Sequence, residues 1–166
     1  TSHVPRDENL AIIDDLPETL YTQADADFYG AEGALNFPLW QSGKLPNNLR
    51  LFGDIVKAEL KDGGKLPRIP PWRIGGNFVF GPEPWQVGMD VIYNAKQDDI
   101  SSFNTAAYTM VNLSFTYDLA MAESNWQLFV RGTNLADENA RKSTSFLAEY
   151  APLPGRSLNA GFRVTF

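Results

Sequence analysis

"GRSLNAGFRVTF" (residues 155–166) is the stretch of the sequence that decides the fold. Its apolar residues alternate strictly with small or polar ones and therefore share one face, made up of Leu158, Ala160, Phe162, Val164 and Phe166. Because successive side chains of a β-strand point to opposite faces, this period of two predicts a strand with one apolar and one polar side. Chain ends are usually frayed and polar, so an apolar aromatic terminus indicates that something binds it.

The composition narrows the class of protein. A length of 166 residues suggests about one domain. A net charge of -6 and a pI near 4.7 argue against a nucleic-acid partner, because phosphate backbones attract basic surfaces. No run approaches the ~18 apolar residues of a membrane-spanning helix. A membrane-spanning barrel remains possible, because each of its strands needs only about 9–11 alternating residues.

Helix signals are almost absent, and glycines and prolines separate segments rich in β-branched and aromatic residues. Seven strands are predicted, at residues 19–37, 49–60, 71–81, 84–95, 107–118, 125–135 and 155–166. Short connections, at 81–84 and 120–125, alternate with long polar ones, at 61–70, 96–106 and 136–154. This alternation is typical of a barrel whose short turns lie in the periplasm.

Two features depart from this pattern. The stretch "PLWQSGKLPN" (38–47) is too long for a periplasmic turn. In the first two strands, apolar positions change parity after Phe28 and again around Gly53, which predicts β-bulges at both places.

The five clearer strands each have an uncharged, apolar face and a more polar one. The polar face includes Arg73, Asp90, Asp118, Arg131 and Arg163. Alternation alone does not tell lipid from a protein core, because a soluble sandwich gives the same stripe. Two details favour a membrane barrel. The strands exceed the ~5–6 residues typical of globular sheets, and large aromatic residues gather at the strand ends, where a bilayer selects them.

The aromatic residues divide between two rims. Those predicted at the short-turn rim are Phe80, Trp85, Tyr117, Trp126 and Phe166, and those predicted toward the long-loop rim are Trp72 and Tyr93.

An odd number of strands leaves two unpaired edges, and a bilayer requires every backbone polar group to be paired. Either residues 8–16 supply an eighth strand or the rest of the barrel lies outside this sequence, and their poor alternation favours the second interpretation. Two alternatives stay open. One is a self-contained eight-stranded barrel acting as an adhesin or anchor. The other is a soluble β-sandwich that binds carbohydrate through Trp40 and Trp72.

Three stretches carry a family resemblance: "YTQADADFYGAEGAL" (21–35), "LPRIPPWRIG" (66–75) and residues 128–166. They resemble the closing third of TonB-dependent outer-membrane receptors. The more specific motifs are Asn134-Leu135-x-Asp137 before the last long loop and Pro154-Gly155-Arg156 at the start of the final strand. The resemblance implies the last seven strands of a 22-stranded barrel at 19–166, an extracellular loop segment at 1–18, and a plug domain outside this chain.

The resemblance also implies a function. Such receptors of Gram-negative outer membranes bind scarce nutrients at the extracellular mouth, and the TonB complex pulls on the plug to open a path. The expected partners are the rest of the barrel, the plug, the TonB complex, outer-membrane lipid and the barrel-assembly machinery. The barrel-assembly machinery would recognise Phe162, Val164 and Phe166. The expected cargo is a metal chelate, a metal ion or a similar nutrient.

No enzymatic grouping is present in the sequence. With one histidine, His3, and no cysteine, the chain can build neither a Ser-His-Asp arrangement nor a structural zinc site by itself. We therefore expect no catalytic residue and no cofactor.

Candidate binding residues remain. The charged residues of the polar face are predicted to form interior salt bridges to a plug, and Asp25 and Asp27 to line the lumen near Arg73 or Arg131. His3, Asp14 and Asp15 have the chemistry of a zinc site, but a solvated acidic loop is the preferred interpretation. In the long loop 137–154, Phe146 and Tyr150 could touch an arriving ligand or pack within the loop.

Overall fold

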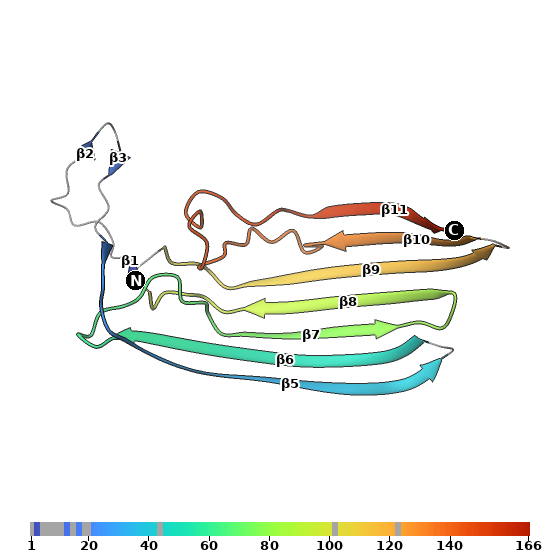
Figure 1. Cartoon of the computed structure of the whole chain (residues 1–166), viewed down its shortest axis with the longest axis horizontal. Helices are drawn as coiled ribbons and strands as arrows, with labels where there is room; N and C mark the ends of the chain where they lie inside the picture. Colours follow the sequence, from blue (N-terminus) through green and yellow to red (C-terminus); the bar gives the residue numbers. More distant parts are fainter. Residues whose placement is uncertain are drawn as a thin grey trace.

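The computed structural model describes residues 2–3, 12–13, 16–17, 21–42, 45–100, 103–121 and 124–166. Its main feature is one antiparallel sheet of seven strands, in the order β11-β10-β9-β8-β7-β6-β5 (Figure 1). The strands are β5 (Ala26–Ser42), β6 (Leu45–Leu60), β7 (Arg73–Phe80), β8 (Trp85–Asn94), β9 (Tyr108–Met121), β10 (Ser124–Thr133) and β11 (Ser157–Thr165). Each strand pairs with its neighbours in sequence, which confirms the predicted all-β meander. The described residues contain no helix that could cross a membrane.

The connections divide between the two ends of the sheet (Figure 1). Short connections lie at one end, which we call the short-turn end. At the other end lie three long ones, which we call loop 1 (61–72), loop 2 (95–107) and loop 3 (134–156). At the short-turn end, Gly81 has a φ of 150°, and a Cβ there would collide with the carbonyl oxygen of Trp85. Its amide donates to Oδ1 of the buried Asn47 at 2.9 Å, which ties two neighbouring hairpins together.

The stretch 38–47 is irregular, as predicted, but it is not a long connection. Strand β5 continues to Ser42, which pairs with Leu45, and the register shifts only between Pro38 and Gln41. The hairpin β5–β6 therefore ends in a short connection like the others. It begins later than predicted, at Ala26.

The bulges predicted after Phe28 and around Gly53 are also wrong, because the register runs without a break from Ala26↔Leu60 to Pro38↔Asn48. The parity changes have another cause. The polar face of this hairpin carries the apolar Phe28 and Phe52, while its opposite face carries charged residues toward the long-loop end.

The strand register confirms the apolar face of the five clearer strands. Its members lie opposite one another from strand to strand, as in Met89↔Leu113 and Val130↔Phe115. Within the described part of the chain no second sheet packs on either face. Side chains such as Ile74 and Leu128 consequently stay 56% and 44% exposed. A compact β-sandwich, one of the two alternatives, is not what the chain forms.

Two small two-stranded sheets precede the main sheet. Strand β1 (Ser2–His3) pairs with β4 (Tyr21–Thr22), and β2 (Ile12–Ile13) pairs with β3 (Leu16–Pro17). Neither joins the seven-stranded sheet. The described parts of 8–16 therefore do not supply an eighth strand, and residues 8–11 and 14–15 lie outside the described residues.

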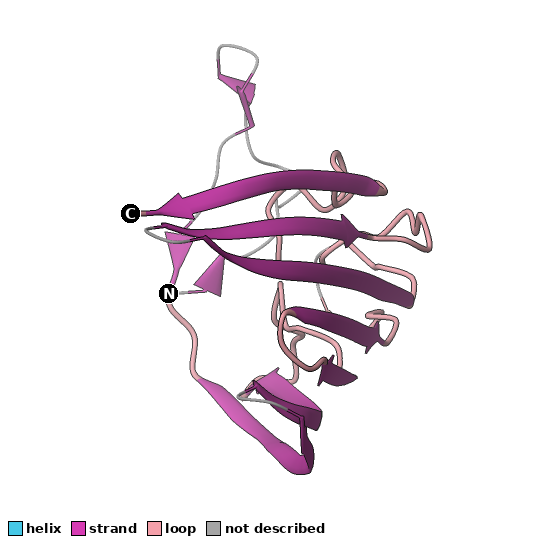
Figure 2. Ribbon diagram, turned by 90° about the vertical axis from the view of Figure 1, so that its right-hand side faces the viewer, coloured by secondary structure: helices cyan, strands magenta, loops and turns pink. Residues whose placement is uncertain are grey.

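The sheet is visibly curved (Figure 2). On its polar face, two glycines lie beneath aromatic rings of the neighbouring strand: Gly75 under Phe52 and Gly161 under Phe129. A Cβ at Gly75 would lie 2.5 Å from Cζ of Phe52, so the ring takes the place of a side chain there. Such glycines permit bending, and the aromatic rings restore the packing that they lack.

The buried apolar residues do not lie in the sheet. Those below about a tenth exposed are in or beside the three long loops: Leu66, Ala95, Ile100, Ala140 and Ala148. The core of the described chain is therefore a loop cluster at one end of the sheet.

Candidate functional site

Direct contacts between the long loops hold the loop cluster together. The Gln97 side chain of loop 2 donates from Nε2 to the Ile69 carbonyl of loop 1 at 2.8 Å, and the backbone of Gln97 pairs with Thr105 across loop 2. Lys65 of loop 1 and Asp99 of loop 2 form an ion pair at 3.0 Å. The loop cluster is therefore one packed structure at the end of the sheet rather than three independent loops.

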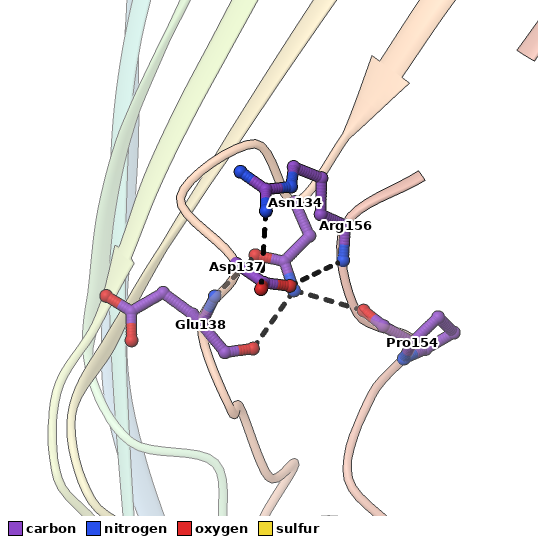
Figure 3. Close-up of polar contacts among 5 residues, drawn as sticks. All are labelled: Asn134, Asp137, Glu138, Pro154 and Arg156. Carbon is purple, nitrogen blue, oxygen red and sulfur yellow. Dashed lines mark hydrogen bonds and ion pairs between the residues drawn. The ribbon is translucent and has the colours of Figure 1, made fainter. Parts of the chain in front are cut away.

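Loop 3 is closed at its base by Asn134, whose side chain is buried (Figure 3). Its Nδ2 donates to the carbonyl of Glu138 at 3.0 Å and to that of Pro154 at 3.1 Å. Its Oδ1 accepts from the Glu138 amide at 2.9 Å, and its own amide donates to Asn112 Oδ1 at 3.0 Å. One side chain therefore joins both ends of loop 3 to each other, while the backbone joins them to the polar face of β9.

A second link lies beside the first (Figure 3). Asp137 accepts from the Arg156 amide at 3.0 Å through Oδ1, and its Oδ2 lies 3.7 Å from the Arg156 guanidinium. Asn134 and Asp137 have φ values of 49° and 56°, a region that asparagine and aspartate tolerate better than most residues. The two motifs on which the family resemblance depends therefore meet in space, and we call their contact the loop clasp (Asn134, Asp137, Glu138, Pro154 and Arg156).

Within loop 3, Arg141 organises the chain. Its Nη1 donates to the carbonyls of Ala148 and Glu149, each at 2.7 Å. Phe146 and Tyr150, the two predicted ligand contacts, are 74% and 78% exposed. The Arg68 guanidinium of loop 1 lies 3.5 Å from the centre of the Phe146 ring. Both aromatic residues thus lie on the surface of the loop cluster.

At the long-loop end of the polar face lies an ion pair that the sequence did not predict. Asp54 of β6 and Arg73 of β7 are direct partners in the sheet, and Arg73 Nε donates to Asp54 Oδ2 at 2.6 Å. The parity of Arg50, Phe52 and Asp54 would have placed Asp54 on the polar face, had no bulge been predicted at Gly53.

Four more of the predicted lumen residues lie on the polar face: Asp90, Asp118, Arg131 and Arg163. The two aspartates accept from amides rather than pairing with opposite charges. Asp90 accepts from Asn77 at 2.6 Å, and Asp118 from Gln127 at 2.9 Å. Asp118 and Arg163 line one cavity of about 520 Å³ at the short-turn end. Arg131 and Arg163 have no ion-pair partner among the residues that the structure describes.

The predicted acidic candidates lie elsewhere. Asp25 pairs with Lys61 at 3.9 Å rather than with an arginine of the sheet. Asp27 lies opposite Glu59, on the face that carries Leu35 and Phe37, so its predicted place in the lumen is wrong.

The candidate zinc ligands lie near the beginning of the chain. Asp14 and Asp15 lie outside the described residues, as does the side chain of His3. In the described part of the chain, no three histidine, aspartate or glutamate side chains gather as a metal site.

The predicted aromatic rims are built from contacting rings. Trp72 and Tyr93 lie 5.3 Å apart at the long-loop end, and Phe80 and Trp85 lie 5.5 Å apart at the short-turn end, where Tyr117 is the strand partner of Trp85. Trp126 stacks on Phe162 at 5.8 Å.

The two rims lie at a spacing that suits a membrane. Trp85 and Tyr93 are eight positions apart on β8, which is about 27 Å along the strand. A tilt of roughly 40° reduces this to about 21 Å across the membrane, close to the ~25 Å apolar band of outer-membrane barrels.

One comparison with known proteins bears on this arrangement. Residues 5–135 match the family model described as "TonB dependent receptor-like, beta-barrel". The matched range contains strands β5 to β10 and, of the loop clasp, Asn134.

Proposed function

Because the chain belongs to the TonB-dependent receptor β-barrel family, whose members are outer-membrane receptors and transporters of Gram-negative bacteria, we propose that it forms the C-terminal wall of such a receptor. The receptor would take up a metal chelate, a metal ion or a similarly scarce nutrient. Members of this family act with a plug and TonB and are transporters rather than enzymes.

The observation that carries this proposal is the two-faced single sheet. Its apolar face is bounded by aromatic rims and is left uncovered by the described chain. Lipid is the partner that suits such a face, because amphipathic rings sit at headgroup level and aliphatic side chains between them.

The edges of the sheet support a larger barrel. Strands β5 and β11 each pair on one side only in the described chain. In a bilayer such edges have to be closed, so further strands would join both, up to the 22 of the family. The plug would then fill the polar side, where Arg131 and Arg163 are available to its carboxylates, with residues 1–18 forming part of an extracellular loop.

The end of the chain supports a role in assembly. Phe162 and Phe166 are 65% and 99% exposed, and Val164 shares their face. An edge strand with an exposed apolar face offers backbone pairing and an aromatic anchor together. The barrel-assembly machinery would recognise this strand by pairing with its backbone and binding its aromatic side chains.

The test is uptake by the native host under starvation. A strain lacking the gene should lose high-affinity uptake of one limiting nutrient, with ⁵⁵Fe-chelates and ⁶⁵Zn as the first cargoes measured. The full-length gene should restore uptake, but not in cells without TonB. A protein that leaves the uptake of every scarce nutrient unchanged and only anchors the envelope would overturn the proposal.

A further inference from the structure

The polar face and all three long loops line a cavity of about 260 Å³ at the long-loop end. Its wall includes Asp54 and Arg73 from the sheet and Arg141, Lys142, Ser143 and Thr144 from loop 3. Under the proposed function, this is the extracellular mouth of the receptor wall, where the cargo arrives.

The charges around the cavity are unbalanced. Three cationic side chains line it, against the single carboxylate of Asp54, which is already bound to Arg73. The Lys142 side chain is exposed and forms no ion pair with any residue that the structure describes. An excess of positive charge in a recess of low dielectric attracts anions and repels free metal cations.

A hydroxyl without a partner points to the same conclusion. Ser143 is 3% exposed, and its Oγ has no hydrogen-bond partner among the described residues. A buried polar group without a partner costs roughly 1–3 kcal/mol, and a ligand that accepts its hydrogen bond recovers that cost. Arg73, Lys142, Ser143 and Thr144 are all donors suited to anionic oxygen atoms.

The wall of the cavity is held in place before any ligand arrives. Arg141 binds two carbonyls across loop 3, and the loop clasp joins the ends of the loop. Leu153 donates to the Ala140 carbonyl at 2.7 Å, which brings the two sides of loop 3 together. A loop held in position loses little entropy on binding, which favours affinity.

We propose that this cavity binds anionic oxygen groups, carboxylate or phosphate, so that the cargo is an anionic chelate or conjugate rather than a free metal cation. This inference rests on the proposed function.

Binding to the full-length protein in detergent tests it, with citrate, inorganic phosphate and Zn²⁺ as separate probes in calorimetry. Lys142→Gln should weaken binding of the anion about fivefold, the upper range for one exposed charge. Asp54→Asn removes the repelling carboxylate and frees Arg73, and should strengthen it by a similar factor. Ser143→Ala should weaken it about threefold. Lys57→Gln is the matched control, because Lys57 lies at the same end of the sheet but outside this cavity.

Citrate binding that exceeds phosphate binding identifies a carboxylate ligand, and the reverse order identifies a phosphate ligand. The proposal is overturned if neither anion binds, if Zn²⁺ binds more tightly than both, or if the Lys142 and Asp54 variants match the Lys57 control. In any of these cases the uptake phenotype can persist. The import function would then stand while the anion site falls.

Discussion

The sheet and the loop cluster bury their side chains in opposite ways. In the middle of the sheet, apolar side chains such as Leu113 remain 41% exposed, whereas Ala140 and Ala148 in loop 3 are 1% and 3% exposed. The strands are therefore stabilised by backbone pairing and by whatever covers them from outside the chain. The loop cluster has a small core of its own.

The two regions also differ in their hydrogen bonds. The sheet depends on many equivalent backbone bonds, so no single side chain decides its stability. In the loop cluster, single polar side chains hold several backbone groups at once, as Asn134 and Arg141 do. The stability of the sheet should accordingly depend on whether a face is apolar or charged. The stability of the loops should depend on individual hydrogen-bonding side chains.

The largest effect is expected for Leu113→Arg. Leu113 lies in the middle of the apolar face of β9, midway between the positions of Thr109 and Tyr117. An arginine at the midplane of an outer-membrane barrel costs about 2–4 kcal/mol. The fraction of folded receptor in the outer membrane, measured by heat-modifiable migration on gels, should fall severalfold.

The matched control is Thr116→Arg, on the polar face of the same strand, opposite Gln86. The same charge there faces the water-accessible interior and should leave assembly close to the wild-type level. Equal assembly defects in the two variants would show that the apolar face does not contact lipid. Lipid would then not explain why the sheet leaves its apolar side chains exposed while the loops bury theirs.

The sheet was largely predictable from the sequence, because a period of two reports directly which residues share a face. The prediction failed where the faces are mixed. Phe28 and Phe52 lie on the polar face of the first hairpin, and Asp27 lies on the opposite one, so parity there suggested bulges that do not exist. Beyond Phe37 the sequence resembled a loop, yet the strand continues through Pro38 as far as Ser42.

The loop cluster was much less predictable. The motifs around Asn134 and Pro154 stood out in the sequence, but nothing in their spacing revealed that they bind each other across loop 3. The ion pair of Asp54 with Arg73 depends on strand register and was missed. Contacts of this kind depend on how the chain returns to itself, which local periodicity does not encode.

An effect of similar energy but confined to one loop, and therefore smaller for the whole protein, is expected for Asn134→Ala. It removes three side-chain hydrogen bonds at a buried position, each worth about 0.5–1.5 kcal/mol, and places an alanine at a φ of 49°. We expect the base of loop 3 to lose about 2–4 kcal/mol of local stability, with faster proteolytic cleavage between residues 137 and 154 and normal assembly of the barrel.

Two controls separate the causes. Asn134→Gly keeps the backbone conformation but loses the same hydrogen bonds, so it should open the loop almost as much. Asn159→Ala, at an exposed position on β11, should have no effect. Protease resistance unchanged by Asn134→Ala would mean that the loop clasp does not hold loop 3.

The smallest effect is expected at the surface of the loop cluster, for the Lys96–Asp98 ion pair of loop 2, which has a contact of 2.6 Å. The hydrogen bond from Lys96 lowers the pKa of Asp98 below its ordinary 3.8, and the same bond raises the pKa of Lys96 above its ordinary 10.5. The stabilisation that Asp98 contributes is fully present at pH values above its ordinary pKa, and it is lost as pH falls through the lowered pKa. That of Lys96 is complete below its ordinary pKa and is lost as pH rises through the raised one.

The pair should therefore contribute equally at every pH from about 5 to 9. Both side chains are more than half exposed, so this contribution is small and weakened further by salt. Hydrogen exchange of residues 95–107, compared between Asp98→Asn and wild type at each pH, should show a difference near zero that does not change between pH 5 and 9. Gln97→Ala is the contrasting variant. The Gln97 side chain is buried and donates to the Ile69 carbonyl, so its removal should clearly accelerate exchange. A pH-dependent difference for Asp98→Asn, or one as large as that of Gln97→Ala, would show that surface charge rather than buried contacts stabilises the loop cluster.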